Sequence, residues 1–139
     1  MDRANLKRTA AGLMVFGLGV ATGIFAQNAM DSDSPQRKEQ KRMDLSGAPG
    51  MEVIASVAEY QKGDTIRQHI HHGIETTYVI QGGTVQAPGK DPVVFPTGAT
   101  LMFPRDLKHA GFTITSDTPL KLFTVHVVDK GQPLYDYSK

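Results

Sequence analysis

Cysteine is absent from the sequence, which has 139 residues and five histidines. Without cysteine the chain has no disulfide, no thiolate zinc or iron–sulfur site and no cysteine nucleophile. Any bound metal must therefore be held by nitrogen and oxygen atoms. An excess of charge of one sign is also missing, because 15 Lys and Arg oppose 14 Asp and Glu, for a net charge of +1. This balance provides no basic field, so we expect no nucleic-acid partner.

An apolar stripe at helical spacing is missing beyond about residue 51, and the 14 Gly and 8 Pro favour a turn-rich β architecture. Short β-rich segments alternate there with turn residues. The predicted strands are residues 52–60, 65–70, 76–81, 84–87, 93–95, 100–103, 111–115 and 120–128. Eight strands separated by turns predict one all-β domain, a closed barrel or jelly roll.

The N-terminal 26 residues are interpreted as a targeting segment that is not part of the fold. Three basic residues among the first eight precede residues 10–26, which carry no charge. This apolar stretch of 17 residues is short for a membrane span and rich in glycine. It predicts a signal peptide cut after Ala26 or Ala29, with an uncleaved N-terminal anchor as the alternative. We therefore expect a periplasmic or secreted protein that has no membrane contact once the signal is removed.

A charged segment follows the targeting segment. Residues 31–42 hold seven charges, one Pro and no large apolar side chain, so they bury too little surface to order themselves. We predict a disordered linker over residues 27–43, the barrel over residues 44–134 and a C-terminal tail over residues 135–139.

Four of the five histidines lie within 41 residues. Alternate side chains of a strand share a face, so His69 and His71 project together. Gly73 permits the chain to reverse, and Glu75 then opens the next strand with its carboxylate directed back to the two imidazoles. His109 begins a later strand and can supply a third imidazole. Clustered His and carboxylate at this spacing predict a metal site.

This spacing resembles the first motif of the cupin superfamily, which reads Gly, five residues, His-x-His, three or four residues, Glu, six residues, Gly. The matching residues are Gly63, His69, His71, Glu75 and Gly82. The second motif is matched by Gly98, Pro104 and His109, with Asp106 in place of a Gly and Thr113 in place of an Asn. The resemblance covers roughly residues 44–133 and is closest to small single-domain exported bacterial cupins of the type 2 conserved barrel.

The resemblance implies a double-stranded β-helix, the jelly-roll barrel, around one divalent transition metal per chain. Three imidazoles and one carboxylate suit Fe, Mn, Ni, Cu, Co or Zn, and this ligand set does not choose among them. The expected ligands are His69, His71, Glu75 and His109. The interior, predicted to include Phe95, Met102, Phe103 and Phe112, suits a small and partly apolar molecule.

Several functions are compatible with such a site. The first hypothesis is an oxidoreductase of the dioxygenase type, with Glu75 acting as a metal ligand or as a base that leaves the metal. A metal-dependent lyase or isomerase, with Glu75, His72 or His126 as the base, is one alternative. A non-catalytic module that binds a metal or a small molecule is the other.

The remaining candidate residues have open roles. His72 has the opposite strand parity and is predicted at the barrel mouth, where it could touch substrate. His126 lies in a strand that is apolar on both faces, and is interpreted as a core or interface histidine. Tyr135 and Tyr137 could cover an opening or pack on a partner subunit, although most such tails fray. Exposed edge strands also make a homodimer an expectation.

Overall fold

The computed structural model describes residues 33–138. The predicted signal segment lies outside this range. The described residues form nine strands and no helix. The strands are β1 (Arg37–Asp44), β2 (Met51–Tyr60), β3 (Thr65–Ile66), β4 (Gly73–Gln81), β5 (Gly83–Gln86), β6 (Val93–Phe95), β7 (Thr100–Phe103), β8 (Phe112–Ile114) and β9 (Leu120–Asp129). A search of residues 33–138 for a membrane-crossing helix finds none.

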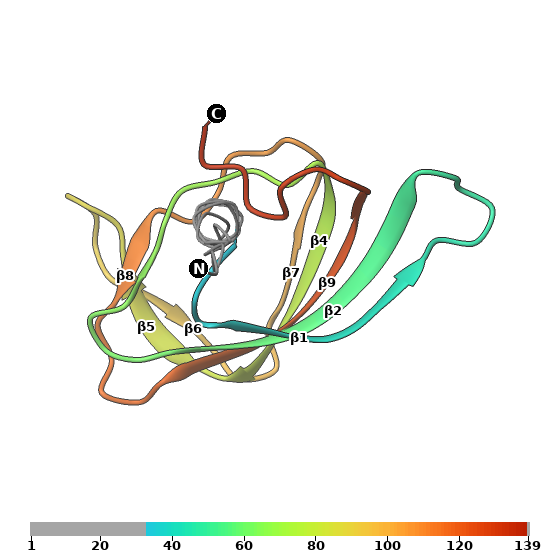
Figure 1. The fold of residues 1–139 in the computed structure, drawn as a ribbon. Coiled ribbons are helices and arrows are strands. Elements are labelled where there is room, and N and C mark those ends of the chain that lie inside the picture. Colours follow the sequence, from blue (N-terminus) through green and yellow to red (C-terminus); the bar gives the residue numbers. More distant parts are fainter. Residues whose placement is uncertain (1–32, 139) are drawn as a thin grey trace, which may run out of the picture.

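The strands form two antiparallel sheets that face each other (Figure 1). One sheet has five strands in the order β1-β2-β9-β4-β7, and the other has four in the order β3-β8-β5-β6. Apart from the β1–β2 and β5–β6 pairs, strands that are neighbours in a sheet are not consecutive in the chain, as in the cross-connected strands of a jelly roll. The all-β jelly-roll prediction is confirmed.

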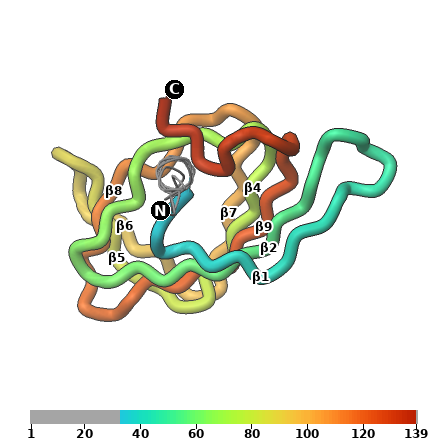
Figure 2. Tube along the Cα trace, in the orientation of Figure 1, coloured from blue at the N-terminus to red at the C-terminus, as the bar shows by residue number. Residues whose placement is uncertain are grey.

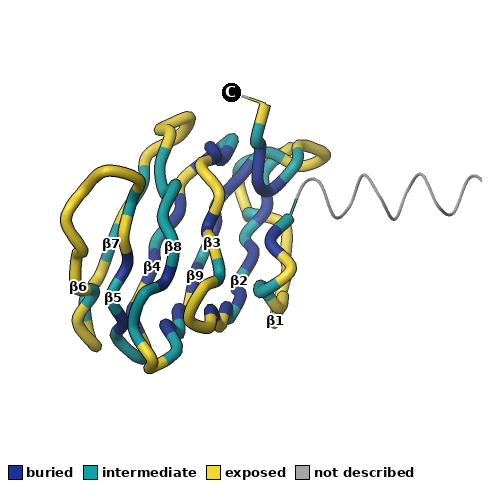
Figure 3. The backbone as a smooth tube through the Cα atoms, turned by 90° about the vertical axis from the view of Figure 1, so that its left-hand side faces the viewer, coloured by how far each residue is buried: buried dark blue, intermediate teal, exposed yellow. Residues whose placement is uncertain are grey.

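The core lies between the two sheets, where side chains from both layers meet. Burial alternates along the long strands, most clearly in β2 and β9, as Figure 3 shows. The main cluster of buried side chains comprises Ala58, Tyr60, Ile66, Val79, Val85, Ile114, Leu120 and Leu122. This alternation results from the two-residue period of a strand, which directs every second side chain inward.

The strand predictions differ most from the structure around the first histidine motif. Residues 93–95 and 100–103 form strands with the predicted bounds, whereas the strand predicted over residues 65–70 ends at Ile66. Beyond it, His69 bridges to His109 and Ile70 bridges to Asp136. Because neighbouring residues pair with two different segments, no regular ladder continues here.

The prediction of a disordered linker over residues 27–43 is wrong from Arg37 onward, where β1 begins. This strand pairs antiparallel along β2. Its inward charges are compensated, since the Arg37 guanidinium donates to Ser56 Oγ at 2.6 Å and the Arg42 guanidinium donates to Glu52 Oε1 at 2.6 Å. An edge strand obtains its order from backbone hydrogen bonds to its neighbour, so a scarcity of apolar residues does not prevent it.

The expectation that the C-terminal tail frays is also wrong. Tyr135 is 5% exposed, and Asp136 exchanges both backbone hydrogen bonds with Ile70 at 3.0 Å. Tyr137 Oη donates to the carbonyl oxygen of Asp33 at 3.4 Å, so the two ends of the described chain lie side by side (Figure 2). The tail therefore belongs to the barrel and crosses it next to the predicted metal ligands.

Candidate metal centre

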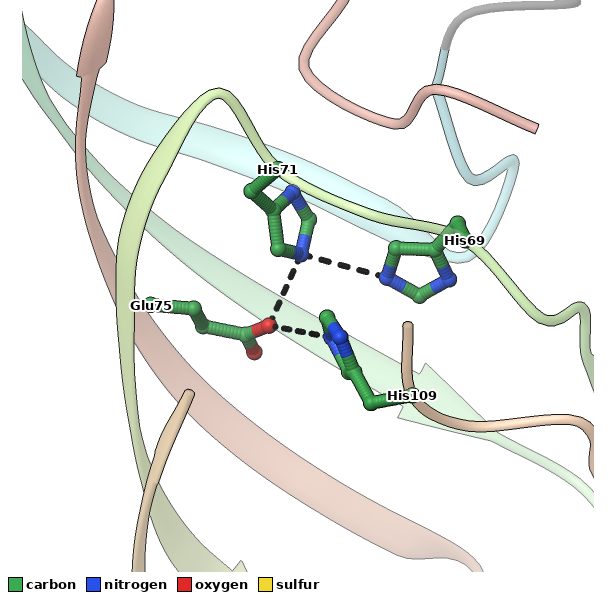
Figure 4. A group of neighbouring side chains, drawn as sticks. All are labelled: His69, His71, Glu75 and His109. Atoms are coloured by element: carbon green, nitrogen blue, oxygen red, sulfur yellow. Dashed lines mark hydrogen bonds and ion pairs between the residues drawn. The ribbon is translucent and has the colours of Figure 1, made fainter. Parts of the chain in front are cut away.

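The four predicted ligands come from three segments that converge at one end of the barrel (Figure 4). His69 and His71 lie between β3 and β4, Glu75 is in β4, and His109 lies between β7 and β8. The backbones of His69 and His109 exchange hydrogen bonds at 3.1 and 3.2 Å. This pairing joins the two sequence motifs, which are 40 residues apart along the chain.

His71 and His109 contact the same carboxylate oxygen of Glu75, and His69 lies against His71. Glu75 Oε2 lies 2.8 Å from His71 Nε2 and 3.1 Å from His109 Nε2, while His69 Nε2 lies 3.1 Å from His71 Nε2. The four potential ligand atoms all lie within 4.8 Å of one another. The structure thus brings together all four residues that the sequence predicts as metal ligands. The cluster suggests one metal site.

Backbone carbonyl groups orient the three imidazoles. The Nδ1 atoms of His69, His71 and His109 lie 2.6, 2.5 and 2.8 Å from the carbonyl oxygens of Arg67, Leu134 and Leu107, respectively. A carbonyl oxygen only accepts, so each Nδ1 carries the hydrogen. A neutral imidazole has one such hydrogen, which leaves each Nε2 with a lone pair directed at the cluster.

This tautomer arrangement fits a bound metal cation. With every Nδ1 donating, three Nε2 lone pairs and an ionised carboxylate occupy a space in which they would repel one another. A cation between them, either a proton or a metal, removes that repulsion. Metal-ligating histidines characteristically donate their other ring N–H to a carbonyl or carboxylate, which fixes the ring and its tautomer. The donor set of three nitrogens and one oxygen fits a divalent first-row transition metal.

The electrostatics of the cluster favour an ionised carboxylate. Burial opposes ionisation of Glu75, but His109 and His71, which donate to its carboxylate when a proton occupies their Nε2 atoms, outweigh this effect and hold the pKa of Glu75 well below its usual value. Thr77 Oγ1 also donates to Glu75 Oε1 at 2.6 Å. Burial acts against the charged form of His109 too, yet its bond to Glu75 raises the pKa of His109. Burial lowers the pKa of His69 to about 4.

Gly73 is required for close approach of two strands, which differs from the expected role in chain reversal. A Cβ at Gly73 would lie 2.0 Å from the carbonyl oxygen of Val127 in β9. No other residue fits there, and a larger one would displace β4 just before Glu75. The glycine therefore allows β4 to lie against β9 two residues before Glu75.

His72 is held outside the cluster by two carboxylates. Its Nε2 lies 3.1 Å from Asp136 Oδ2 and its Nδ1 lies 3.3 Å from Asp106 Oδ1. Asp106 has a φ of 61°, the left-handed region in which glycine is most easily accommodated. This conformation explains why the second cupin motif has Gly at the position that Asp106 occupies.

His126 is fully buried in the core, directly behind the carboxylate. Its Nε2 lies 3.9 Å from Glu75 Oε2, and its ring meets the ring of His71 edge-on at 4.6 Å between centroids. Neither ring nitrogen has a hydrogen-bond partner among the described residues. Burial lowers the pKa of His126 to about 3, so the ring is neutral at physiological pH. His126 is thus a core histidine, one of the two locations expected from its sequence, and its proximity to Glu75 was not predicted.

A cavity of about 200 Å³ borders His69, Glu75 and His109. Its walls are mostly apolar and include Ile66, Phe95, Leu101, Phe103, Phe112 and Leu122. Three of the four predicted interior residues line it, but Met102 is 67% exposed on the outside of β7. Tyr135, one of the two tyrosines expected to cover an opening or pack on a partner subunit, lines the cavity with its ring centroid 4.6 Å from that of His69.

The likeness to one solved structure supports the fold, and two further structures resemble the chain less well. A double-stranded β-helix protein from Klebsiella pneumoniae aligns with a TM-score of 0.51 at 11% identity, over 75% of this chain and 87% of that one. A cupin superfamily protein from Desulfitobacterium hafniense aligns with a TM-score of 0.42 at 15% identity, over 70% and 82%. The DMSP lyase DddQ from Ruegeria pomeroyi aligns with a TM-score of 0.45 at 20% identity, over 58% and 40%.

Sequence comparison identifies the family. None of the curated proteins matches the chain significantly. The family described as Cupin domain matches residues 56–126, which is just over half of the chain and includes all four residues of the cluster. Since this match and the jelly-roll fold agree, the chain belongs to the cupin family.

Proposed function

We propose that this cupin is a metal-dependent oxidoreductase of the dioxygenase type that acts on a small, largely apolar organic molecule. One observation carries the proposal. The cavity opens directly onto His69, Glu75 and His109, and among the described residues its lining has no carboxylate or imidazole outside this cluster. A lyase or isomerase needs a base that is not engaged by the metal, whereas an oxygenase relies on the metal and O2.

The other polar groups of the lining are suited to orienting a substrate. Burial raises the pKa of Tyr60 to about 12, and burial also raises the pKa of Tyr135 well above its usual value. Both phenols therefore keep their protons; the Tyr60 hydroxyl lies 3.3 Å from Ser34 Oγ, which leaves Tyr135 as the phenol that could donate to a substrate. Thr124 Oγ1 is buried and has no partner among the described residues, so it is available to a polar group of the substrate.

The three histidines and Glu75 would hold the metal, which would supply the activation of O2. Four protein ligands leave coordination positions open on a metal that prefers five or six. The apolar walls exclude water from the reacting molecule. A dioxygenase places both atoms of O2 in its product, so no separate reductant has to fit into the cavity of about 200 Å³.

We also propose that the chain is exported. The basic residues at its start and the uncharged stretch over residues 10–26 support this assignment. Mass spectrometry of periplasmic extract tests it, and we expect cleavage near Ala26. An intact N-terminus on membrane-bound protein would instead indicate an anchor.

The enzymatic proposal is tested by metal analysis followed by oxygen uptake. The purified protein should contain about one transition metal per chain. Reloaded anaerobically with Fe, Mn, Ni, Cu, Co or Zn, it is then screened against small uncharged molecules. Oxygen consumption with a redox-active metal that is lost in Glu75→Gln would support the proposal. Leu101→Trp, which fills the cavity, should weaken substrate binding but leave metal content unchanged, and Val94→Trp on the exposed surface should alter neither.

The other outcomes contradict the proposal in distinct ways. Product formation without oxygen uptake would indicate a lyase or isomerase. Saturable binding without turnover would indicate a binding module. If the purified protein contains no metal and added metals do not raise its melting temperature, the cluster is not a metal site.

A further inference from the structure

One buried hydroxyl group in the wall of the cavity has no hydrogen-bond partner. Among the described residues, the buried side-chain atoms without a partner are Thr124 Oγ1 and the two ring nitrogens of His126. Of these two residues only Thr124 borders the cavity, and it is 3% exposed. A buried hydroxyl without a hydrogen bond costs stability, so such a group in a folded protein calls for a partner that the chain itself does not supply.

The strand register explains why the neighbouring side chains leave Thr124 without a bond. Thr124 in β9 lies between Ser56 of β2 and Thr77 of β4, and directly paired residues share a face of the sheet. Both neighbours have other partners, since Ser56 Oγ accepts from Arg37 Nη1 at 2.6 Å and Thr77 Oγ1 donates to Glu75 Oε1 at 2.6 Å. Because no bond holds the Thr124 side chain in one rotamer, its hydroxyl can turn toward a ligand in the cavity.

The register also gives the depth of Thr124 in the barrel. Glu75 pairs with His126, which is two residues further along β9, so Thr124 lies about 7 Å deeper than the row of Glu75. The next row inward is wholly apolar and consists of Ala58, Leu122 and Val79. Thr124 is therefore the last polar position of these strands before the apolar core, one strand repeat below the metal cluster.

The rest of the wall restricts the chemistry of a ligand at this depth. Apart from His69, Glu75 and His109, the described side chains that line the cavity are uncharged. An ionised group beside Thr124 would be buried without a counter-charge, so the group that binds there is uncharged. An apolar cavity of about 150 Å³ holds a benzene molecule, so the cavity of about 200 Å³ holds a six-membered ring with a small substituent at each end.

We propose that Thr124 forms a second polar subsite of the cavity, which binds an uncharged hydroxyl group at the end of the substrate that lies away from the metal cluster. The substrate class is then a small uncharged molecule with an apolar body and two oxygen groups, one directed to the cluster and one to Thr124. A hydroxyl group both donates to and accepts from the threonine hydroxyl, whereas a carbonyl group only accepts. The inference rests on the proposed function in taking the cavity as the substrate site, but it does not depend on which reaction takes place there.

Isothermal titration calorimetry with two matched probes tests the proposal. The first probe, trans-1,4-cyclohexanediol, has a hydroxyl group at each end, and the second, trans-4-methylcyclohexanol, has a methyl group in place of one hydroxyl. Zinc-loaded protein is used, because zinc is not redox-active and the probes are bound without turnover. The ratio of diol affinity to methylcyclohexanol affinity should fall about 10-fold or more in Thr124→Val, which keeps the shape of the side chain but removes its hydroxyl. Thr76→Val, on the outward side of β4 opposite Met102, is the matched control and should keep the wild-type ratio.

Thermal unfolding of the metal-free protein is a second test that needs no ligand. Thr124→Val removes a buried hydroxyl without a partner and should raise the melting temperature, whereas Thr77→Val removes the hydroxyl that donates to Glu75 and should lower it.

These measurements separate the subsite from the oxygenase proposal. The same affinity ratio in the wild type and Thr124→Val, or a lower melting temperature of Thr124→Val, would overturn the subsite. A protein that consumes no oxygen but shows the expected change in ratio would contradict the oxygenase and support the subsite. If zinc does not bind, the ratio is measured on the metal-free protein, where a 10-fold change still supports the subsite and an unchanged ratio overturns it.

Discussion

The Nδ1–H group of His71 donates a hydrogen bond of 2.5 Å to the carbonyl oxygen of Leu134, which is 63 residues further along the chain. This bond connects a predicted metal ligand to Leu134, the last residue of the predicted barrel, directly before the predicted tail. It fixes the tautomer and the orientation of the His71 ring, so that Nε2 faces Glu75. The C-terminal segment therefore contributes to the metal centre although it supplies no ligand.

Removal of the C-terminal segment should weaken metal binding. A chain that ends at Pro133 lacks the carbonyl group that orients His71, and we expect its metal affinity to fall about 10- to 100-fold. Titration against a competing chelator measures this change, with circular dichroism as a check of folding. A chain that ends at Tyr137 keeps the bond and should bind metal as the full chain does. Wild-type affinity in the shorter chain would show that the bond has no role.

Substitution of a predicted ligand should reduce metal retention more than substitution of the neighbouring His126. His69→Ala, His71→Ala and His109→Ala each remove a nitrogen from the cluster and should abolish metal retention. His126→Ala removes only a side chain that packs behind Glu75, so metal should be retained. Elemental analysis after dialysis distinguishes these results. Equal loss of metal in all four variants would indicate that His126 is also a ligand.

The metal-free protein should lose stability in mild acid. The pKa values of His69 and His126 are lowered by burial to about 4 and about 3, against 6.5 in the unfolded chain. The unfolded state therefore binds more protons below pH 6.5. Each histidine contributes stability that is complete above that pH and declines by up to about 1.4 kcal/mol per pH unit as the pH falls. The raised pKa of His109 acts in the opposite direction and partly offsets this loss.

Urea unfolding of the metal-stripped protein at pH 7 and pH 5 measures this dependence. His126→Leu replaces the buried imidazole with an apolar side chain, so the free energy of unfolding should vary less with pH in this variant. An unchanged pH dependence would show that His126 does not titrate on unfolding.

Position 106 should accept without loss of stability only residues that adopt a left-handed backbone conformation. With its φ of 61°, Asp106→Val should lower the free energy of unfolding by about 1–2 kcal/mol. Asp106→Asn should change it by less than about 0.5 kcal/mol, because Asn also visits this region. Asp106→Gly relieves the backbone but removes the contact with His72, so we expect a small net change. Equal stability of the Val and Asn variants would contradict the argument.

The strands and the four clustered residues could be predicted from sequence because both follow local rules. The two-residue period of a strand places His69 and His71 on one side of the chain. The turns around Gly63 and Gly98 lie at fixed distances before each histidine motif. β1 could not be predicted, because its order depends on backbone pairing with β2 and not on its own composition.

The sequence by itself determined the fold family, the absence of thiol chemistry and the identity of the candidate ligands. Only the tertiary structure decided how they are supported and what surrounds them. In the tertiary structure the Leu134 carbonyl oxygen accepts a hydrogen bond from His71, and Tyr135 lies in the cavity wall. His126 packs behind Glu75, and Met102 points outward. These relationships join residues far apart in the chain, so they depend on how the two sheets and the C-terminal segment close on one another, which no local pattern encodes.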